Sequence, residues 1–119
     1  MAILNKQQLH QLAMNIVGKE LEKQGFEFLT VNSVMAKNPQ FVVLRDKKLH
    51  FVIVRAIEYP NQPNDYDETF LSKVKNHAAK YNAKTYYAGV GLANNSDYDL
   101  PVDSEQNYVV NFSGLIEIH

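Results

Sequence analysis

The stretch that decides the fold is FVVLRDKKLHFVIVRAIEY, residues 41–59. It consists of two apolar segments, 40–45 and 49–59, around a short charged turn, and this predicts an antiparallel β-hairpin. The second segment is apolar at both alternating sets of positions: Phe51, Ile53 and Ile57 on one face, and Val52, Val54 and Ala56 on the other. Because a strand with one solvated face would alternate apolar and polar residues, this strand should be central and covered on both faces.

The rest of the chain supplies helices and further strands around this hairpin. Residues 5–24 have apolar residues at helical spacing, with Asn5 as an N-cap and Gly25 as the C-terminal stop. A second helix is expected at about 68–81, capped by Asp65 or Asp67, with a buried stripe. The stripe residues are Phe70, Leu71, Val74, Ala78 and Tyr81. Further strands are expected at 26–31, 84–93, 108–112 and 115–118.

This order of elements predicts the fold class. A helix between two buried strands implies a parallel crossover connection. We therefore expect one α/β domain over residues 1–119, with the order α-β-β-β-α-β plus terminal strands. A mixed β-sheet with an α-helix on each face satisfies these connections.

Composition and charge restrict the function classes. The chain has 119 residues, 45% of them hydrophobic, which is enough for one well-formed core. It has no cysteine, which excludes disulfides and thiolate metal sites and fits a reducing compartment. No signal peptide or membrane span is apparent, so a cytoplasmic location is expected. The net charge is −1, so any nucleic-acid binding must come from a local basic patch.

The element order and several residues resemble the restriction-endonuclease-like fold of the PD-(D/E)xK nuclease superfamily. The similarity covers about residues 9–92 and is greatest to small members related to archaeal Holliday-junction resolvases and bacterial YraN-like proteins. In that group a helix that ends in leucine and glycine leads into the first strand, as in LEKQGFEFL here, and a hairpin follows. The matching residues are Leu21, Gly25, Phe26, Phe51 and Val52.

The resemblance does not extend to the catalytic groups. The motif aspartate falls on Phe41, or on Gln40 if the register slips, and the acid and lysine of the second motif fall on Ile53 and Arg55. The acid often found in the first helix falls near Asn15. Such nucleases hold Mg²⁺ with carboxylates, and these side chains cannot replace that set. Arginine also stays protonated and cannot act in proton transfer as lysine does. We expect no catalytic site, no metal and no cofactor.

Arg55 raises a question of its own, because it shares a strand face with Phe51 and Ile53. A lone buried charge is costly, so the guanidinium needs a carboxylate partner or a path to solvent. The carboxylates considered as partners are Glu58, Asp65 and Asp67. Alternatively, Arg55 binds a phosphate or carboxylate of a ligand through a bidentate contact.

The second helix and its end carry a cluster of cations. They are Lys73, Lys75, His77, Lys80 and Lys84. In the resembling nucleases the corresponding helix often faces nucleic acid, but a solvated outer face or stabilisation of the helix C-terminus explains these cations equally well. None of the histidines has a metal-binding spacing, and structural or surface roles are expected for His10, His50, His77 and His119. His50 is expected at the solvent-facing start of its strand.

Three functions follow as hypotheses. The first is a non-catalytic binding or protein-assembly module that self-associates or takes a protein partner, through an exposed strand edge or residues 108–118. The second is a nucleic-acid-binding protein that uses the lysine-rich helix. The third is a nuclease or other hydrolase with a relocated site, built from Asp46, Glu58 or Asp67 with His77.

Overall fold

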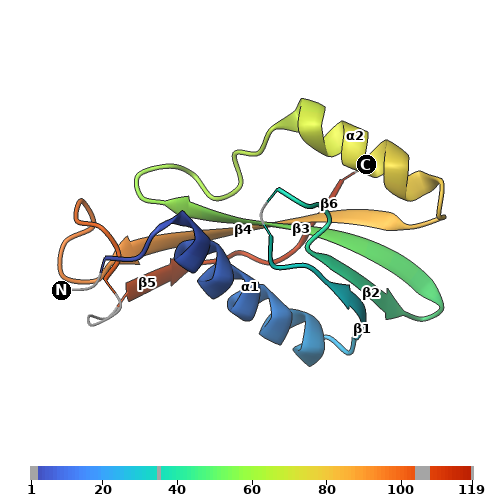
Figure 1. The fold of residues 1–119 in the computed structure, drawn as a ribbon, viewed down its shortest axis with the longest axis horizontal. Coiled ribbons are helices and arrows are strands. Elements are labelled where there is room, and N and C mark those ends of the chain that lie inside the picture. Colours follow the sequence, from blue (N-terminus) through green and yellow to red (C-terminus); the bar gives the residue numbers. More distant parts are fainter. Residues whose placement is uncertain (1–2, 35, 104–107, 119) are drawn as a thin grey trace.

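The structure is a computed structural model that describes residues 3–34, 36–103 and 108–118. Its elements follow the predicted order (Figure 1). In chain order they are α1 (Lys6–Lys23), β1 (Glu27–Val31), β2 (Phe41–Arg45), β3 (Lys48–Glu58), α2 (Glu68–Ala79), β4 (Lys84–Asn94), β5 (Tyr108–Asn111) and β6 (Ile116–Ile118). The chain is thus an α/β structure with six strands and two helices in the part described.

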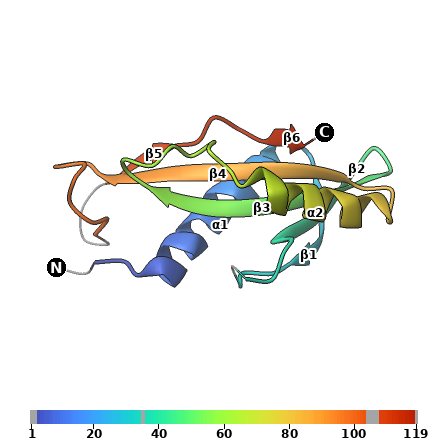
Figure 2. The same cartoon turned by 90° about the horizontal axis from the view of Figure 1, so that it is seen from above.

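The strands form one mixed sheet in the order β1-β2-β3-β4-β5, and β6 also pairs with β4. The β3–β4 pair is parallel and the other pairs are antiparallel. β5 and β6 follow one another along β4 (Figure 2). The sequence prediction that the strand at 49–59 is central is confirmed, because β3 lies between β2 and β4.

The hairpin between β2 and β3 has a two-residue turn. Asp46 and Lys47 have φ values of 53° and 64°, and Arg45 pairs with Lys48 across the turn. Positive φ at both central residues matches the twist of the flanking strands, which is why such turns are common in tight hairpins. The predicted hairpin is confirmed, and β3 begins one residue earlier than expected.

Side-chain caps define where the helices begin. Asn5 and Gln8 form a reciprocal capping box: the Asn5 side chain accepts from the Gln8 amide at 2.8 Å, and the Gln8 side chain accepts from the Asn5 amide at 2.9 Å. Gly25, with φ of 84°, follows the end of α1 as predicted. Of the two proposed caps for α2, Asp67 is the one used, since its carboxylate accepts from the Phe70 amide at 3.1 Å.

The predicted stripe of the second helix needs one correction. Leu71 and Ala78 are buried, and Phe70 and Val74 pack against the core. Tyr81, however, is 57% exposed. The helix ends at Ala79, before Tyr81, so the helical period no longer directs this ring toward the sheet.

Each face of the sheet has its own apolar cluster, because successive side chains of a strand point to opposite faces. Val52 and Val54 of β3 belong to a large cluster that includes Leu9, Val17 and Leu21 of α1. Ile53 points the other way and packs with Leu71 of α2 and Tyr87 of β4. The two helices therefore cover different faces (Figures 1 and 2).

The glycines of β4 admit a close approach by the loop before α2. A Cβ atom on Gly89 would clash with the backbone of Pro63, and one on Gly91 would lie 2.7 Å from Pro63 Cγ. The Tyr87 hydroxyl donates to the Pro63 carbonyl at 2.8 Å and fixes the loop there. A glycine inside a strand often marks such a close approach by another backbone segment. Neither helix in the described chain has the length and apolar character needed to cross a membrane.

Candidate functional site

Arg55 is in the last part of β3, where β2 no longer pairs with this strand. The first residue of β2, Phe41, pairs with Val52, so the part of β3 beyond this point extends past its antiparallel neighbour. The segment before β2 turns here, and Gln40 takes over part of the pairing. Its amide donates to the Val52 carbonyl at 3.1 Å, and its side-chain oxygen accepts from the Val54 amide at 2.9 Å.

The guanidinium of Arg55 is held by neutral oxygens. Nη1 donates to the Val54 carbonyl at 2.8 Å and to the Gln40 side chain at 3.4 Å, and Nη2 donates to the Asn38 side chain at 3.0 Å. Its Cζ atom lies 5.3 Å from the centroid of the Phe70 ring, within the range of a cation–π contact. Arginine has five N–H donors, so one at Nε and one at Nη2 have no hydrogen-bond partner among the described residues.

No carboxylate of the described residues forms an ion pair with Arg55. The alternative in which Glu58, Asp65 or Asp67 pairs with Arg55 is therefore wrong. Glu58 ends β3 in an exposed position, and Asp67 is used as the helix cap. Burial lowers the pKa of Arg55, and the Tyr87 hydroxyl partly opposes this shift. Arginine keeps its proton in proteins, so the site holds a half-buried positive charge that neutral groups hydrogen-bond but do not balance.

A solvent-open hollow adjoins this charge. It has a volume of about 490 Å³ and is lined by Gln7, Val34, Ala36, Asn38 and Arg55. Gln7 comes from the first turn of α1 and the other loop residues from the segment between β1 and β2. The alternative in which Arg55 reaches solvent at the strand end agrees with this position. The hollow also leaves room for an anionic group beside the guanidinium.

The degenerate motif positions fall on two faces of the sheet. Phe41 is buried with the α1 cluster, and Asn15 is exposed on α1 and accepts from the Gln11 side chain. Ile53 is fully buried in the α2 cluster, on the same face of β3 as Arg55. Gln40, the slipped-register alternative, is the residue that contacts Arg55. The structure therefore brings together Gln40 and Arg55, beside Ile53, and leaves Phe41 and Asn15 elsewhere.

The cations of the second helix are spread over its surface. Lys73, His77 and Lys80 are exposed, whereas Lys75 is half-buried and Lys84 pairs with Glu117 at 3.8 Å. The His77 ring lies 5.4 Å from that of Tyr81 and 6.4 Å from that of Phe51. These residues therefore form a mixed basic and aromatic surface at the end of α2, and not a closed pocket.

Two histidines are buried, not exposed. His50, expected at a solvent-facing strand start, is buried and lies between the rings of Phe26 and Tyr86. The prediction of a solvent-facing position was wrong because the side chains of Phe26 and Tyr86 cover this end of β3. His10 is also buried, and neither of its ring nitrogens has a hydrogen-bond partner among the described residues. Burial lowers the pKa of both rings, with a smaller effect of nearby Arg55 on His10 and of Arg45 on His50. His119 lies outside the described residues.

The residues of the hypothetical relocated site do not converge. Asp46 is in the hairpin turn, and Glu58 is at the other end of β3. Asp67 caps the start of α2, and His77 is in its last turn. Within the described ranges, no group of three His, Cys, Asp or Glu residues is placed to hold a metal ion.

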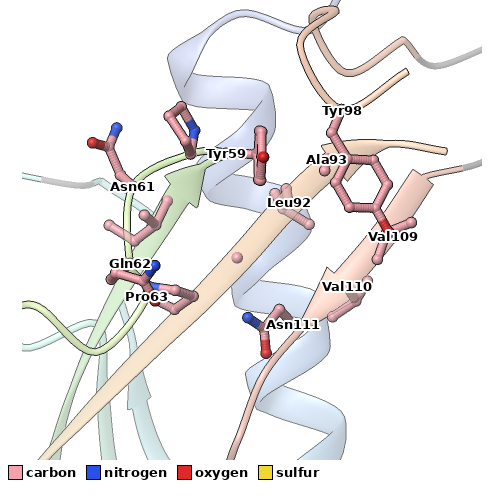
Figure 3. Close-up of a pocket in the computed structure, with 13 residues that line it drawn as sticks. Tyr59, Asn61, Gln62, Pro63, Leu92, Ala93, Tyr98, Val109, Val110 and Asn111 are labelled. Carbon is pink, nitrogen blue, oxygen red and sulfur yellow. The ribbon is translucent and has the colours of Figure 1, made fainter. Parts of the chain in front are cut away.

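A second hollow lies on the α2 face, at the carboxyl ends of the parallel strands β3 and β4. It is a groove of about 410 Å³ that crosses β4 at Gly91 and Ala93. Figure 3 shows the loop side chains of residues 59–63 on one side of β4, and Tyr98 with the side chains of β5 on the other. The rings of Tyr59 and Tyr98 meet edge to face, with centroids 5.2 Å apart. Ligands commonly bind at the carboxyl ends of parallel strands in α/β sheets.

Sequence reasoning missed Asn38 at the Arg55 hollow and Tyr59 and Tyr98 at the groove. Asn38 lies in a connection without periodic pattern, so nothing indicated that its side chain would reach β3. The two tyrosines are far apart in sequence. A partial signal was present for the groove, since two small residues, Gly89 and Gly91, alternate along an otherwise buried strand.

The fold and sites thus define an α/β domain with a mixed sheet, a half-buried arginine and an aromatic groove. A protein family described as a domain of unknown function, DUF8840, matches residues 7–118, and the chain belongs to that family. Comparisons with curated proteins and with solved structures return no match.

Proposed function

We propose that this chain is a non-catalytic binding or assembly module on a restriction-endonuclease-like scaffold, and that Arg55 binds an anionic group of its ligand or partner. The observation that carries the proposal is the guanidinium itself. It is half-buried, it has neutral hydrogen-bond partners and no carboxylate among the described residues, and it borders an open hollow.

The hydrogen bonds around Arg55 support a role in binding more than a role in stability. The Gln40 oxygen also accepts from the Val54 amide at 2.9 Å, and the Asn38 oxygen also accepts from the Gln40 side-chain amide at 2.9 Å. Both oxygens therefore keep a donor if Arg55 is removed. Because a buried charge opposes folding unless it is paired, the protein does not need this arginine to complete its core.

The placement of the degenerate motif supports the scaffold part of the proposal. In the slipped register, the motif aspartate falls on Gln40, the second acid on Ile53 and the lysine on Arg55. Of these three residues, Gln40 contacts Arg55. Ile53 is enclosed by Leu71 and Tyr87, which leaves no oxygen ligand at the second carboxylate position. A site of this composition fits the binding of an anion better than the activation of water by Mg²⁺.

The proposal is tested by replacing Arg55 and measuring stability and anion binding separately. The probe is inorganic phosphate, titrated into the full chain and followed by NMR shifts of the amides around Arg55. We expect Arg55→Met to abolish saturable phosphate binding and to leave the free energy of unfolding unchanged within about 0.5 kcal/mol.

Arg45 offers a matched control. It is the other arginine of the chain, also half-buried, and it also combines a backbone carbonyl, that of Gln24 at 3.2 Å, with an aromatic ring, that of Phe26 at 4.1 Å. Arg45→Met should keep phosphate binding. An Arg55→Met protein that is strongly destabilised and still binds phosphate would show that Arg55 is structural.

A nucleic-acid-binding function is the second candidate, favoured by the exposed aromatic ring next to the lysines of α2. Tyr81 is 57% exposed, and exposed rings beside cations can stack on unpaired bases. We expect Lys73→Glu with Lys80→Glu to weaken binding of a single-stranded oligonucleotide at low salt. Lys84 is the weaker contributor, because Glu117 neutralises it. Absence of binding at low salt in the unmodified chain would exclude this function.

A partner in the cytoplasm, either another protein or a second copy of this chain, is part of the same proposal. It is supported by the cysteine-free composition, which suits a reducing compartment, and by the apolar side chains exposed at the sheet edges.

A further inference from the structure

We propose that the groove at the carboxyl ends of β3 and β4 binds a neutral, proline-rich peptide in an extended conformation. This site is separate from the Arg55 hollow, and the two share no lining residue. The groove is framed by Tyr59, Tyr98 and Pro63 (Figure 3). The small residues Gly91 and Ala93 of β4 form its floor.

The two tyrosine rings provide the apolar contact surface. Tyr59 is 49% exposed and Tyr98 is 47% exposed, so each ring packs against the other and still presents surface to the groove. Their planes are inclined by 71°, which leaves an angular surface and not a flat one. Aromatic-lined grooves of this kind accept the ridged faces of polyproline helices, whose conformation is already extended before binding.

The polar residues that line the groove favour hydrogen bonds to the backbone of a peptide over contacts with a charged ligand. Gln62 and Asn111 are lining residues that carry side-chain amides, and the Asn111 side chain lies beside β4 (Figure 3). An extended proline-rich segment has no internal hydrogen bonds, and its carbonyls need donors such as these amides. Among the described residues, no lysine, arginine, histidine, aspartate or glutamate lines the groove. An uncharged ligand therefore matches this lining better than a nucleic acid or a charged peptide.

The floor of the groove depends on glycine. A Cβ atom on Gly91 would lie 2.7 Å from Pro63 Cγ and 3.1 Å from Asn111 Cβ, so a larger residue would push the two walls apart. The walls are thus placed by the tight packing of the 59–63 loop on β4. This packing makes the groove a preformed feature of the fold, and preformed sites lose less entropy on binding.

The sheet edges are less suited to a peptide than this face. β1 carries a register shift between Phe28 and Thr30, and β5 and β6 are four and three residues long. Irregular and short edge strands are the features by which proteins prevent strand addition. A peptide that used main-chain pairing would meet these obstacles, whereas a peptide in the groove would not.

The test uses an oligoproline peptide with blocked, uncharged ends, titrated into the full chain. We expect saturable binding that is insensitive to salt and that Tyr98→Ala and Tyr59→Ala each weaken about tenfold. Tyr81→Ala is the matched control, because Tyr81 is at least as exposed as the groove tyrosines but lies just beyond the end of α2, and it should leave binding unchanged. Arg55→Met should also leave it unchanged, which separates this site from the anion site.

Three outcomes would overturn the proposal. The first is no saturable binding of the oligoproline to a chain that is folded by its NMR spectrum. The second is equal binding of a glycine–serine peptide of the same length, which would show that the rings do not select for proline. The third is perturbation of Tyr59 and Tyr98 by an oligothymidine and not by the peptide, which would make the groove a base-stacking surface.

Discussion

The two faces of the sheet differ in how completely they are covered. On one face, the 18 residues of α1 pack over a broad apolar cluster that includes Phe41 of β2, Val52 of β3 and Leu92 of β4. On the other face, the 12 residues of α2 cover a smaller cluster around Ile53, and the carboxyl ends of β3 and β4 stay open. The comparison indicates that the α1 face chiefly provides stability, whereas the uncovered part of the α2 face carries the aromatic groove. The Arg55 hollow lies beside β3, between the first turn of α1 and the segment that joins β1 to β2.

Truncation of one leucine on each face tests this division with the largest expected effect. Leu21 and Leu71 are both buried, one in each cluster. Leu21→Ala should lower the free energy of unfolding by about 2–5 kcal/mol, because a large core cannot collapse around the cavity. Leu71→Ala should cost less, since the smaller cluster can adjust. Urea unfolding measures the free energy of unfolding of both variants. Equal losses of this free energy would argue against a difference between the faces.

Gln40 contacts Arg55, but we expect its replacement to affect stability. Gln40→Leu removes the acceptor for the Val54 amide, which lies in the buried part of β3. We expect the free energy of unfolding to fall by about 1–3 kcal/mol, the usual cost of an unsatisfied buried donor. Gln11→Leu, at an exposed glutamine of α1, should change it little. An unchanged stability of Gln40→Leu would mean that Val54 finds another acceptor.

The buried histidines predict a smaller, pH-dependent effect. The pKa values of His10 and His50 in the folded chain lie below the ordinary value of 6.5, chiefly because both rings are buried. As pH falls below 6.5, the unfolded chain takes up protons that the folded chain does not, so stability should decrease. Urea midpoints on either side of this value measure the loss, and His10→Leu should reduce it.

A variant that lacks both buried rings checks this assignment. His10→Leu combined with His50→Leu should remove more of the slope of stability against pH than His10→Leu alone, because burial lowers the pKa of both rings. A slope that is unchanged in a folded double variant would contradict the assignment to these histidines.

The sequence predicted the hairpin, the central strand, both helices and the alternation of faces, because these depend on local apolar period and turn residues. The prediction failed for the burial of residues at the ends of these elements, because tertiary contacts determine it. Tyr81 was assigned to the buried stripe because it continues the helical period, but α2 ends two residues before it. His50 was placed at the surface because it starts a strand, although Phe26 and Tyr86 cover it.

The candidate sites were only partly predictable. Arg55 stood out because a charge in a doubly apolar strand needs an explanation, and its position on the Ile53 face follows from strand alternation. Its partners did not follow, since Asn38 comes from an irregular loop and Gln40 reaches it from the position just before β2. The groove combines Tyr59, Tyr98 and β5, which are distant in sequence and come together only through the sheet order.

The most direct test of the central claim is the charge balance at Arg55. Asn38→Asp replaces the amide oxygen 3.0 Å from Arg55 Nη2 with a carboxylate of the same shape, and so supplies the partner that the site lacks. The Arg55 Nε–H resonance of the full chain is followed during titration with inorganic phosphate. We predict a saturable shift in the unmodified chain and none in a folded Asn38→Asp variant. No shift in the unmodified chain, or the same shift in both proteins, would contradict an anion site at Arg55.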